Sequence, residues 1–222
     1  MKPLYENPGK NVSAFKEAFE AEGVDWALIG GLAAIEHRAT GRETVDVDFV
    51  VSSLASLERR LERMQLARVR VLEEPEGSPY LVQGETADGM HFDIYVASID
   101  FENAVLATKD DKHVASAEAV ILYKLMAMRR EDVDDVRSIL DNHPGLKGLD
   151  VEFIERWAAE LDVQDEWHGF VAEYQKAKNI RSQLILPASD TGDQANTPKT
   201  RYVKKQGVDT LGRRYTRWIR QA

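Results

Sequence analysis

The spacing of hydrophobic positions changes several times along the first half of the chain, and this predicts alternating helices and strands. Apolar residues recur at helical spacing over residues 11–22 and 53–65, whereas residues 44–51 alternate with a period of two. The same patterns predict a short strand over 24–30, a helix over 32–39 and three further strands over 67–74, 80–86 and 90–97. We therefore expect an α/β (α+β) fold, a mixed β-sheet with flanking helices.

The pattern becomes helical after residue 115. Four amphipathic segments follow, at residues 116–128, 131–140, 151–161 and 165–178, and residues 187–198 have the composition of a linker. This predicts an α/β domain over residues 1–114, a C-terminal helical segment over 115–180, and a linker with a basic tail over 181–222.

Charge is distributed unevenly along the chain. Residues 199–222 contain eight cationic residues and one acid, a net charge of +7, so the remaining 198 residues carry −16 of the total of −9. Two tyrosines and one tryptophan lie between these cations, and this mixture suits RNA with unstacked bases. A tail that is solvated, or one that folds onto the acidic part of the chain, would explain the same composition equally well. With no cysteine, secretory signal or run of about 20 apolar residues, we expect a cytoplasmic protein that does not enter a membrane.

The alternating segment 44–51 contains two acids that folding alone does not require. Asp46 and Asp48 point to one face of the predicted strand and lie about 7 Å apart, so their charges repel unless a cation lies between them. Asp93 occupies an equivalent place in another predicted strand. If the two strands are neighbours, three carboxylates converge, and such hard oxygen ligands suit Mg²⁺.

A glycine pair precedes these acids. Gly30 and Gly31 lie where a predicted strand turns into a helix, and the free N–H groups of a helix start favour phosphate. A phosphate cradle facing a carboxylate pair is the arrangement that metal-assisted phosphoryl transfer needs, with no histidine base or covalent nucleophile.

These blocks, "GG", "TVDVDFV" and "HFDIY", resemble the nucleotidyltransferases of the DNA polymerase β superfamily. The segment "EAVILYKLMAMRREDVDDVRSIL" is similar to the helical part of the AbiEii-type abortive-infection toxins within that superfamily, and the resemblance covers about residues 24–141. It implies a nucleotidyltransferase fold, with the catalytic domain over residues 1–114. The implied activity is Mg²⁺-dependent transfer of a nucleoside monophosphate from an NTP to an acceptor hydroxyl, with release of pyrophosphate.

The resemblance also implies roles for individual residues. The metal ligands of a two-metal Mg²⁺ site would be Asp46, Asp48 and Asp93, with Asp93 activating the acceptor hydroxyl. The nucleotide-binding residues would be Gly30, Gly31, Arg42, Thr44, Lys124 and Asp132. Asp132 or Asp135 would position Lys124 or a base. Similarity to the toxin group implies an RNA acceptor, such as the tRNA 3′ end, and a partner antitoxin.

Other interpretations of the same residues remain open. An antibiotic nucleotidyltransferase of the aminoglycoside or lincosamide type shares the glycine turn and aspartate strand, and a non-catalytic nucleotide- or RNA-binding module would keep the fold. Taken singly, two aspartates on a strand also suit a solvated edge, and Lys124 suits a surface lysine with a buried stem.

Overall fold

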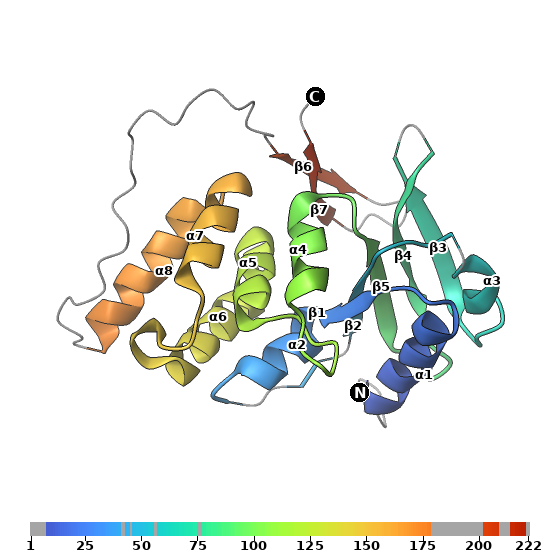
Figure 1. Ribbon diagram of the computed structural model, residues 1–222, viewed down its shortest axis with the longest axis horizontal. Coiled ribbons are helices and arrows are strands. Elements are labelled where there is room, and N and C mark those ends of the chain that lie inside the picture. The colour runs from blue at the N-terminus through green and yellow to red at the C-terminus, as the bar shows by residue number, and fades with distance from the viewer. Residues whose placement is uncertain are drawn as a thin grey trace. The chain divides into compact units, whose positions relative to one another are not determined.

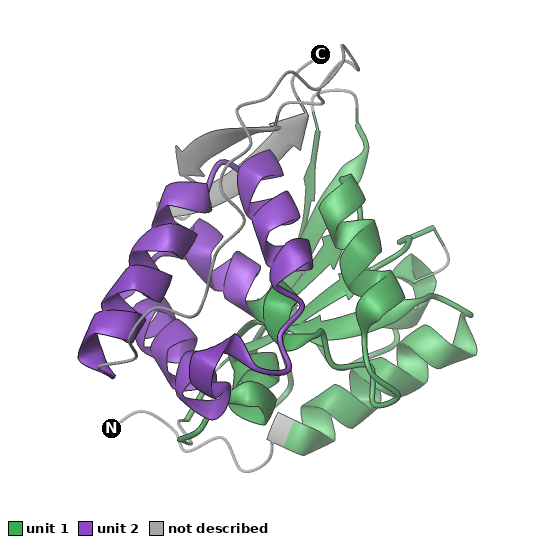
Figure 2. Ribbon diagram, turned by 60° about the vertical axis from the view of Figure 1, so that its left-hand side comes forward, with its two compact units in different colours: residues 1–120 green, residues 121–222 purple. Residues whose placement is uncertain are grey.

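The computed structural model describes residues 8–40, 43–44, 46–55, 57–74, 77–178, 202–208 and 214–220. The chain divides into two compact units, Met1–Val120 and Ile121–Ala222, coloured green and purple in Figure 2. The boundary falls within one helix, α5 (Ala117–Ala127).

A five-stranded mixed sheet forms the centre of the first unit (Figure 1). Its strands lie in the order β1-β2-β5-β4-β3, with β2 and β5 parallel and the other neighbours antiparallel. The strands are β1 (Trp26–Ile29), β2 (Asp46–Val51), β3 (Ala67–Glu73), β4 (Pro79–Glu85) and β5 (His91–Val96). The helices of this unit are α1 (Pro8–Ala21), α2 (Gly30–His37), α3 (Glu58–Leu61) and α4 (Asp100–Thr108). The expected mixed sheet with flanking helices is confirmed.

One face of this sheet is closed by α1. Phe15 lies with its ring centroid 5.2 Å from that of Phe49 and 5.0 Å from that of Phe92, so it contacts both β2 and β5. Phe19 meets Phe49 and Trp26 in the same way, at 5.1 and 5.6 Å. All five rings are buried, and burying aromatic rings of this size supplies much of the stability of a small core. The side chains that alternate with Phe49 and Phe92 therefore face the opposite side of the sheet.

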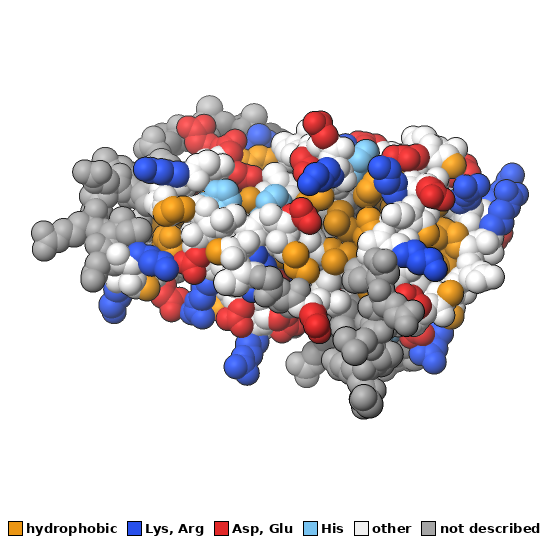
Figure 3. All heavy atoms as spheres, turned by 90° about the horizontal axis from the view of Figure 1, so that it is seen from below, with side chains coloured by type: hydrophobic (Ala, Val, Ile, Leu, Met, Phe, Trp, Pro, Cys, Tyr) orange, Lys and Arg blue, Asp and Glu red, His pale blue; other side chains and the backbone are white. Residues whose placement is uncertain are grey.

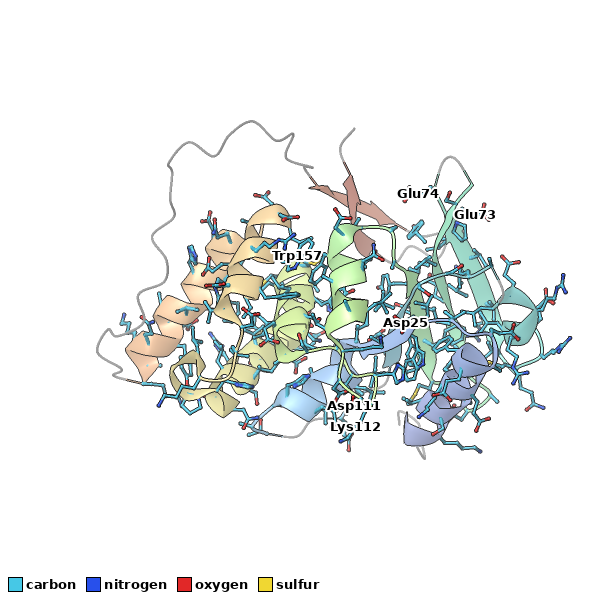
Figure 4. All side chains as sticks on the ribbon, viewed as in Figure 1. Asp25, Glu73, Glu74, Asp111, Lys112 and Trp157 are labelled. Carbon is cyan, nitrogen blue, oxygen red and sulfur yellow. The ribbon has the colours of Figure 1, made fainter. Side chains whose placement is uncertain are left out.

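The turn after α4 is held against the start of β1. The His113 ring stacks on Trp26 with a centroid distance of 4.4 Å, and the backbone N–H of Leu28 donates to the carbonyl of His113. Lys109 pairs with Asp25 at 2.8 Å. Figure 4 labels Asp25 beside β1, and shows Asp111 at the outside of the turn, pointing away from the sheet. These contacts fix the edge strand β1, and with it the turn that leads from β1 into α2.

The second unit is mainly helical. It contains the end of α5, then α6 (Arg130–Asn142), the short 3-10 helix η1 (Pro144–Leu146), α7 (Val151–Glu160) and α8 (Gln164–Ala177). Glu155 of α7 accepts hydrogen bonds from Trp167 at 2.8 Å and from His168 at 2.9 Å, which fastens α7 to α8. The expected C-terminal helical segment is confirmed.

Three regions of the chain differ from the sequence-based expectation. The helix expected over 53–65 is reduced to the four residues of α3, although Leu54, Leu57 and Leu61 are buried as its periodicity requires. Helix α4 was not expected. In the segment expected to be a basic tail, β6 (Tyr202–Val208) and β7 (Arg214–Arg220) pair as an antiparallel hairpin, in line with their β-branched and aromatic residues. The expected linker, residues 187–198, lies outside the described residues.

In the part of the chain that the structure describes, none of the helices has the length and apolar character needed to cross a membrane.

Candidate active site

Strands β2 and β5 bring two of the predicted acids to the same level. The strands are parallel neighbours, with Asp48 directly opposite Asp93 and Asp46 opposite His91. Neighbouring strands lie about 4.8 Å apart, and the side chains of Asp46, Asp48 and Asp93 are half-buried on the face away from α1. The adjacency of the two strands, on which the predicted carboxylate site depends, is therefore present. The face carries two carboxylates side by side and a third two residues along β2.

The glycine turn lies against these acids. β1 pairs with β2 so that Ile29 is opposite Asp48, and Gly30 follows as the first residue of α2 with φ +66°. A Cβ on residue 30 would lie 1.8 Å from Oδ2 of Asp48, so no residue with a side chain fits there without moving the carboxylate. From the sequence, glycine was expected at this turn because it lets the backbone approach a ligand closely. The structure adds a second reason, which is the close approach of the Asp48 carboxylate to Gly30.

The first turn of α2 has N–H groups that its own cap does not satisfy. Ile29 occupies the N-cap position and provides no side-chain hydrogen bond, and Gly31 is buried as the second residue of the helix. A helix of this kind presents backbone donors and the positive end of its dipole at the N-terminus. The turn that carries these donors approaches Asp48 closely at Gly30, and a helix start of this kind favours phosphate.

Of the two residues predicted beside the acids on the loop before β2, one is described. The Thr44 hydroxyl donates to the backbone carbonyl of Asp46 at 3.4 Å. Thr44 thus helps to shape the approach to β2. Arg42 lies outside the described residues, and its contact with a triphosphate stays a prediction.

Gln83 of β4 is a site residue that sequence analysis missed. It lies directly opposite Asp93, and its side-chain Nε2 donates to Asp93 Oδ1 at 3.2 Å. On the other side of β4, Arg70 of β3 is opposite Gln83, so Asp48, Asp93, Gln83 and Arg70 form one row across four strands. The signal was present as a polar residue within the apolar segment 80–86, but the pairing partner of a strand is not written in its own sequence.

His91 lies on the same face at the neighbouring level. Its Nδ1 is 3.8 Å from Oε1 of Glu85, which also accepts from Arg68 at 2.8 Å. Both His91 and Arg68 are largely exposed. This cluster marks the solvent end of the polar face.

Lys124, Asp132 and Asp135 meet inside the second unit. Lys124 Nζ lies 2.7 Å from Oδ1 of Asp132 and 2.9 Å from Oδ2 of Asp135, and all three side chains are buried. Arg129 Nε adds a contact of 2.8 Å to Asp132. Burial acts to raise the pKa of Asp132, but the hydrogen bonds from Arg129 and Lys124 outweigh it, so the pKa lies below its usual value. The cluster joins α5 to α6, and its contact with nucleotide phosphates stays a prediction.

The chemical type of the three carboxylates fits a metal ion better than their spacing does. Among the described residues, no three acidic or histidine side chains form a close cluster that would enclose an ion. Asp46, Asp48 and Asp93 nevertheless share one face, and their donors are all oxygen, the ligand type that Mg²⁺ prefers. Because Mg²⁺ keeps several waters and binds through one or two carboxylates together with phosphates, a ready-made protein cage is not required.

Charge on the surface does not mark a ligand site by itself. Figure 3 shows one face of the molecule, where acidic and basic side chains of the described residues are interspersed. The polar row across the sheet is distinguished by the close approach of Asp48 to Gly30.

Comparison with known proteins gives similarity in structure only. No protein-family model matches the sequence, and no curated protein has a significantly similar sequence. A Helicobacter pylori protein named as a nucleotidyltransferase is 16% identical over 82% of this chain and 86% of its own, with a TM-score of 0.48. The antibiotic-resistance factor ANT(2'')-Ia is 14% identical over 77% and 96%, with a TM-score of 0.47. The lincosamide antibiotic adenylyltransferase LnuA, bound to lincomycin, is 19% identical over 40% and 54%, with a TM-score of 0.32. Similarity at this level reflects shared parts of a fold and assigns no activity.

Proposed function

We propose that this protein is a nucleotidyltransferase that moves a nucleoside monophosphate from an NTP to an acceptor hydroxyl in a Mg²⁺-dependent reaction. The observation that carries the proposal is the meeting of Gly30 with Asp48 at the level of Asp93. The backbone N–H groups at the start of α2 suit the phosphate oxygens of a triphosphate, and the neighbouring carboxylates suit the Mg²⁺ ion bound to it.

Each part of this face has a task in the proposed reaction. The first N–H groups of α2 would hold phosphate oxygens, and Asp46, Asp48 and Asp93 would hold Mg²⁺. The bound ion would supply charge neutralisation for the triphosphate and the departing pyrophosphate. Asp93, at the shared level with Asp48, accepts the proton of the acceptor hydroxyl as its oxygen bonds to the α-phosphorus, while the bond from that phosphorus to the β-phosphate oxygen breaks and pyrophosphate leaves. Glycine at position 30 keeps Asp48 within reach of the same phosphates.

An RNA acceptor is the part of the proposal that the C-terminal hairpin supports. β6 and β7 place Lys204 opposite Trp218 and Lys205 opposite Arg217. The two strands contain no acid and five cationic residues, namely Lys204, Lys205, Arg214, Arg217 and Arg220. Cations interleaved with aromatic residues suit a phosphate backbone with unstacked bases. The tRNA 3′ end, the toxin role and an antitoxin partner are further predictions. Labelling of purified tRNA would test the first, and a growth assay with and without a gene for the antitoxin would test the other two.

The experiment that tests the activity is an acceptor screen. The full chain is incubated with Mg²⁺, each α-labelled NTP, and either total RNA or an aminoglycoside. We expect label in RNA, with loss of labelling in Asp48→Asn and Asp93→Asn and no change in Asp111→Asn, an exposed acid of the turn after α4.

The alternatives give different results in the same screen. Label in the aminoglycoside supports an antibiotic nucleotidyltransferase, an activity related to that named for LnuA. A wild-type protein that binds NTP but releases pyrophosphate with neither acceptor is a non-catalytic binding module, and that outcome refutes the proposal.

A further inference from the structure

Gln83 is a neutral side chain in direct contact with the carboxylate of Asp93, one of the proposed metal ligands. Its Nε2 donates to Oδ1 of Asp93 at 3.2 Å, across the antiparallel pair of β4 and β5. Because an ionised carboxylate only accepts hydrogen bonds, the amide N–H end must face Asp93. The direction of the amide is thus decided by Asp93, and the carbonyl end points elsewhere.

Among the described residues, none provides a partner for that carbonyl end. Gln83 Oε1 is shut off from solvent and accepts no hydrogen bond from any residue that the structure describes. A buried acceptor without a donor costs free energy, and turning the amide round would set its oxygen against the carboxylate of Asp93. For folding alone, an apolar side chain of similar length would serve better at this position.

The position of Gln83 along the sheet is set by its neighbour. A Cβ at Gly84 would lie 2.8 Å from the end of the Phe92 ring and 3.0 Å from the carbonyl of Ala67. Glycine at this position lets β4 lie close over the buried ring. The register that places Gln83 opposite Asp93 therefore depends on packing from the other face of the sheet.

We infer that Gln83 is a positioning residue, which holds one oxygen of Asp93 so that the other is presented to the metal and the acceptor. Gln83 acts through Asp93, because its own carbonyl oxygen is closed to solvent. The inference rests on the proposed function. It differs from a packing role in one respect: loss of the amide weakens metal binding and turnover without weakening the fold.

The test is Gln83→Met in the full chain, measured by Mn²⁺ binding to the free protein, thermal unfolding and steady-state kinetics. Partners of metal-binding carboxylates change metal affinity or activity by about 10- to 100-fold when removed. We expect Mn²⁺ affinity and kcat to fall by about that factor, the KM for NTP to stay the same, and the unfolding midpoint to stay the same or rise. Gln65→Met, at an exposed glutamine of the same unit, should change none of these.

The outcomes separate this inference from the proposed function. A Gln83→Met protein that binds Mn²⁺ as tightly as the wild type refutes the inference and leaves the proposed function standing. A lowered unfolding midpoint refutes it as well, because the amide then serves the fold. A wild-type protein that binds no Mn²⁺ and labels neither acceptor in the screen refutes the proposed function, and the inference falls with it.

Discussion

Gly30 and Asp48 are so close that a Cβ on residue 30 would lie 1.8 Å from the carboxylate oxygen Oδ2. Gly30 is also held at φ +66°, where L-residues are strained. The contact couples the turn before α2 to the acid of β2. Any change that separates them alters both parts of the proposed nucleotide site.

Substitution of this glycine by alanine should therefore abolish activity. Gly30→Ala must bear the strain of positive φ, about 1–2 kcal/mol, and must also displace Asp48. Gly23→Ala is the matched control, because Gly23 has φ +63° with open space around its Cα. Denaturant unfolding and the acceptor assay should show both variants destabilised, with activity lost only in Gly30→Ala. Equal activity in the two variants would contradict the role given to the contact.

Replacement of Lys124 should destabilise the protein strongly. Lys124→Met leaves Asp132 and Asp135 buried with one cation fewer, and removal of one partner from a buried pair costs about 3–5 kcal/mol. Arg137→Met breaks the exposed pair with Glu173 and should cost at most about 1 kcal/mol. Urea unfolding measures both. If Lys124→Met proves as stable as Arg137→Met, Lys124 is not needed to hold α5 to α6.

Glu102 should make stability depend on pH between about 4.5 and 7. Burial raises the pKa of Glu102 from 4.5 to about 7, against hydrogen bonds from Ser98 and Ile99 that act to lower it. The folded state then binds more protons than the unfolded state in this window, so the free energy of unfolding falls as pH rises through it. The effect is at most about 3 kcal/mol.

Glu102→Gln isolates this contribution, because the amide oxygen still accepts from the backbone N–H groups before α4. The difference in unfolding free energy between wild type and Glu102→Gln should change with pH only between about 4.5 and 7. A difference that stays constant from pH 4 to pH 8 would show that burial leaves the pKa of Glu102 at its usual value.

The hairpin should contribute to RNA affinity in a salt-dependent manner. The logarithm of RNA affinity falls linearly with the logarithm of salt concentration, and each single-strand phosphate contact adds about 0.7 to the steepness of that line. Lys204→Ala with Arg217→Ala should therefore reduce the steepness by about 1.4. Filter binding at several salt concentrations measures this. Lys16→Ala, an exposed lysine of α1, serves as control. Unchanged RNA affinity in the double variant, or after deletion of residues 187–222, would show that the hairpin does not contribute to RNA binding.

The local elements were largely predictable because each is written in a short stretch of chain. The alternation in residues 44–51 placed Asp46 and Asp48 on one face, and the segment 90–97 did the same for Asp93. α3 was overestimated because the same apolar periodicity also suits buried loop positions, as Leu54 and Leu57 show. The row of Asp93 and Gln83 was not predictable, since it depends on which strand lies beside β5.

By itself, the sequence determined the kinds of element, the face on which each acid lies and the presence of glycine at the turn into α2. These depend on alternation along a single segment and on the backbone freedom of single residues. Only the tertiary structure decided that β2 pairs with β5, that Asp48 touches Gly30, and that Gln83 holds Asp93. Such contacts join residues up to 45 positions apart along the chain, and the packing of the aromatic core on the other face of the sheet selects their register.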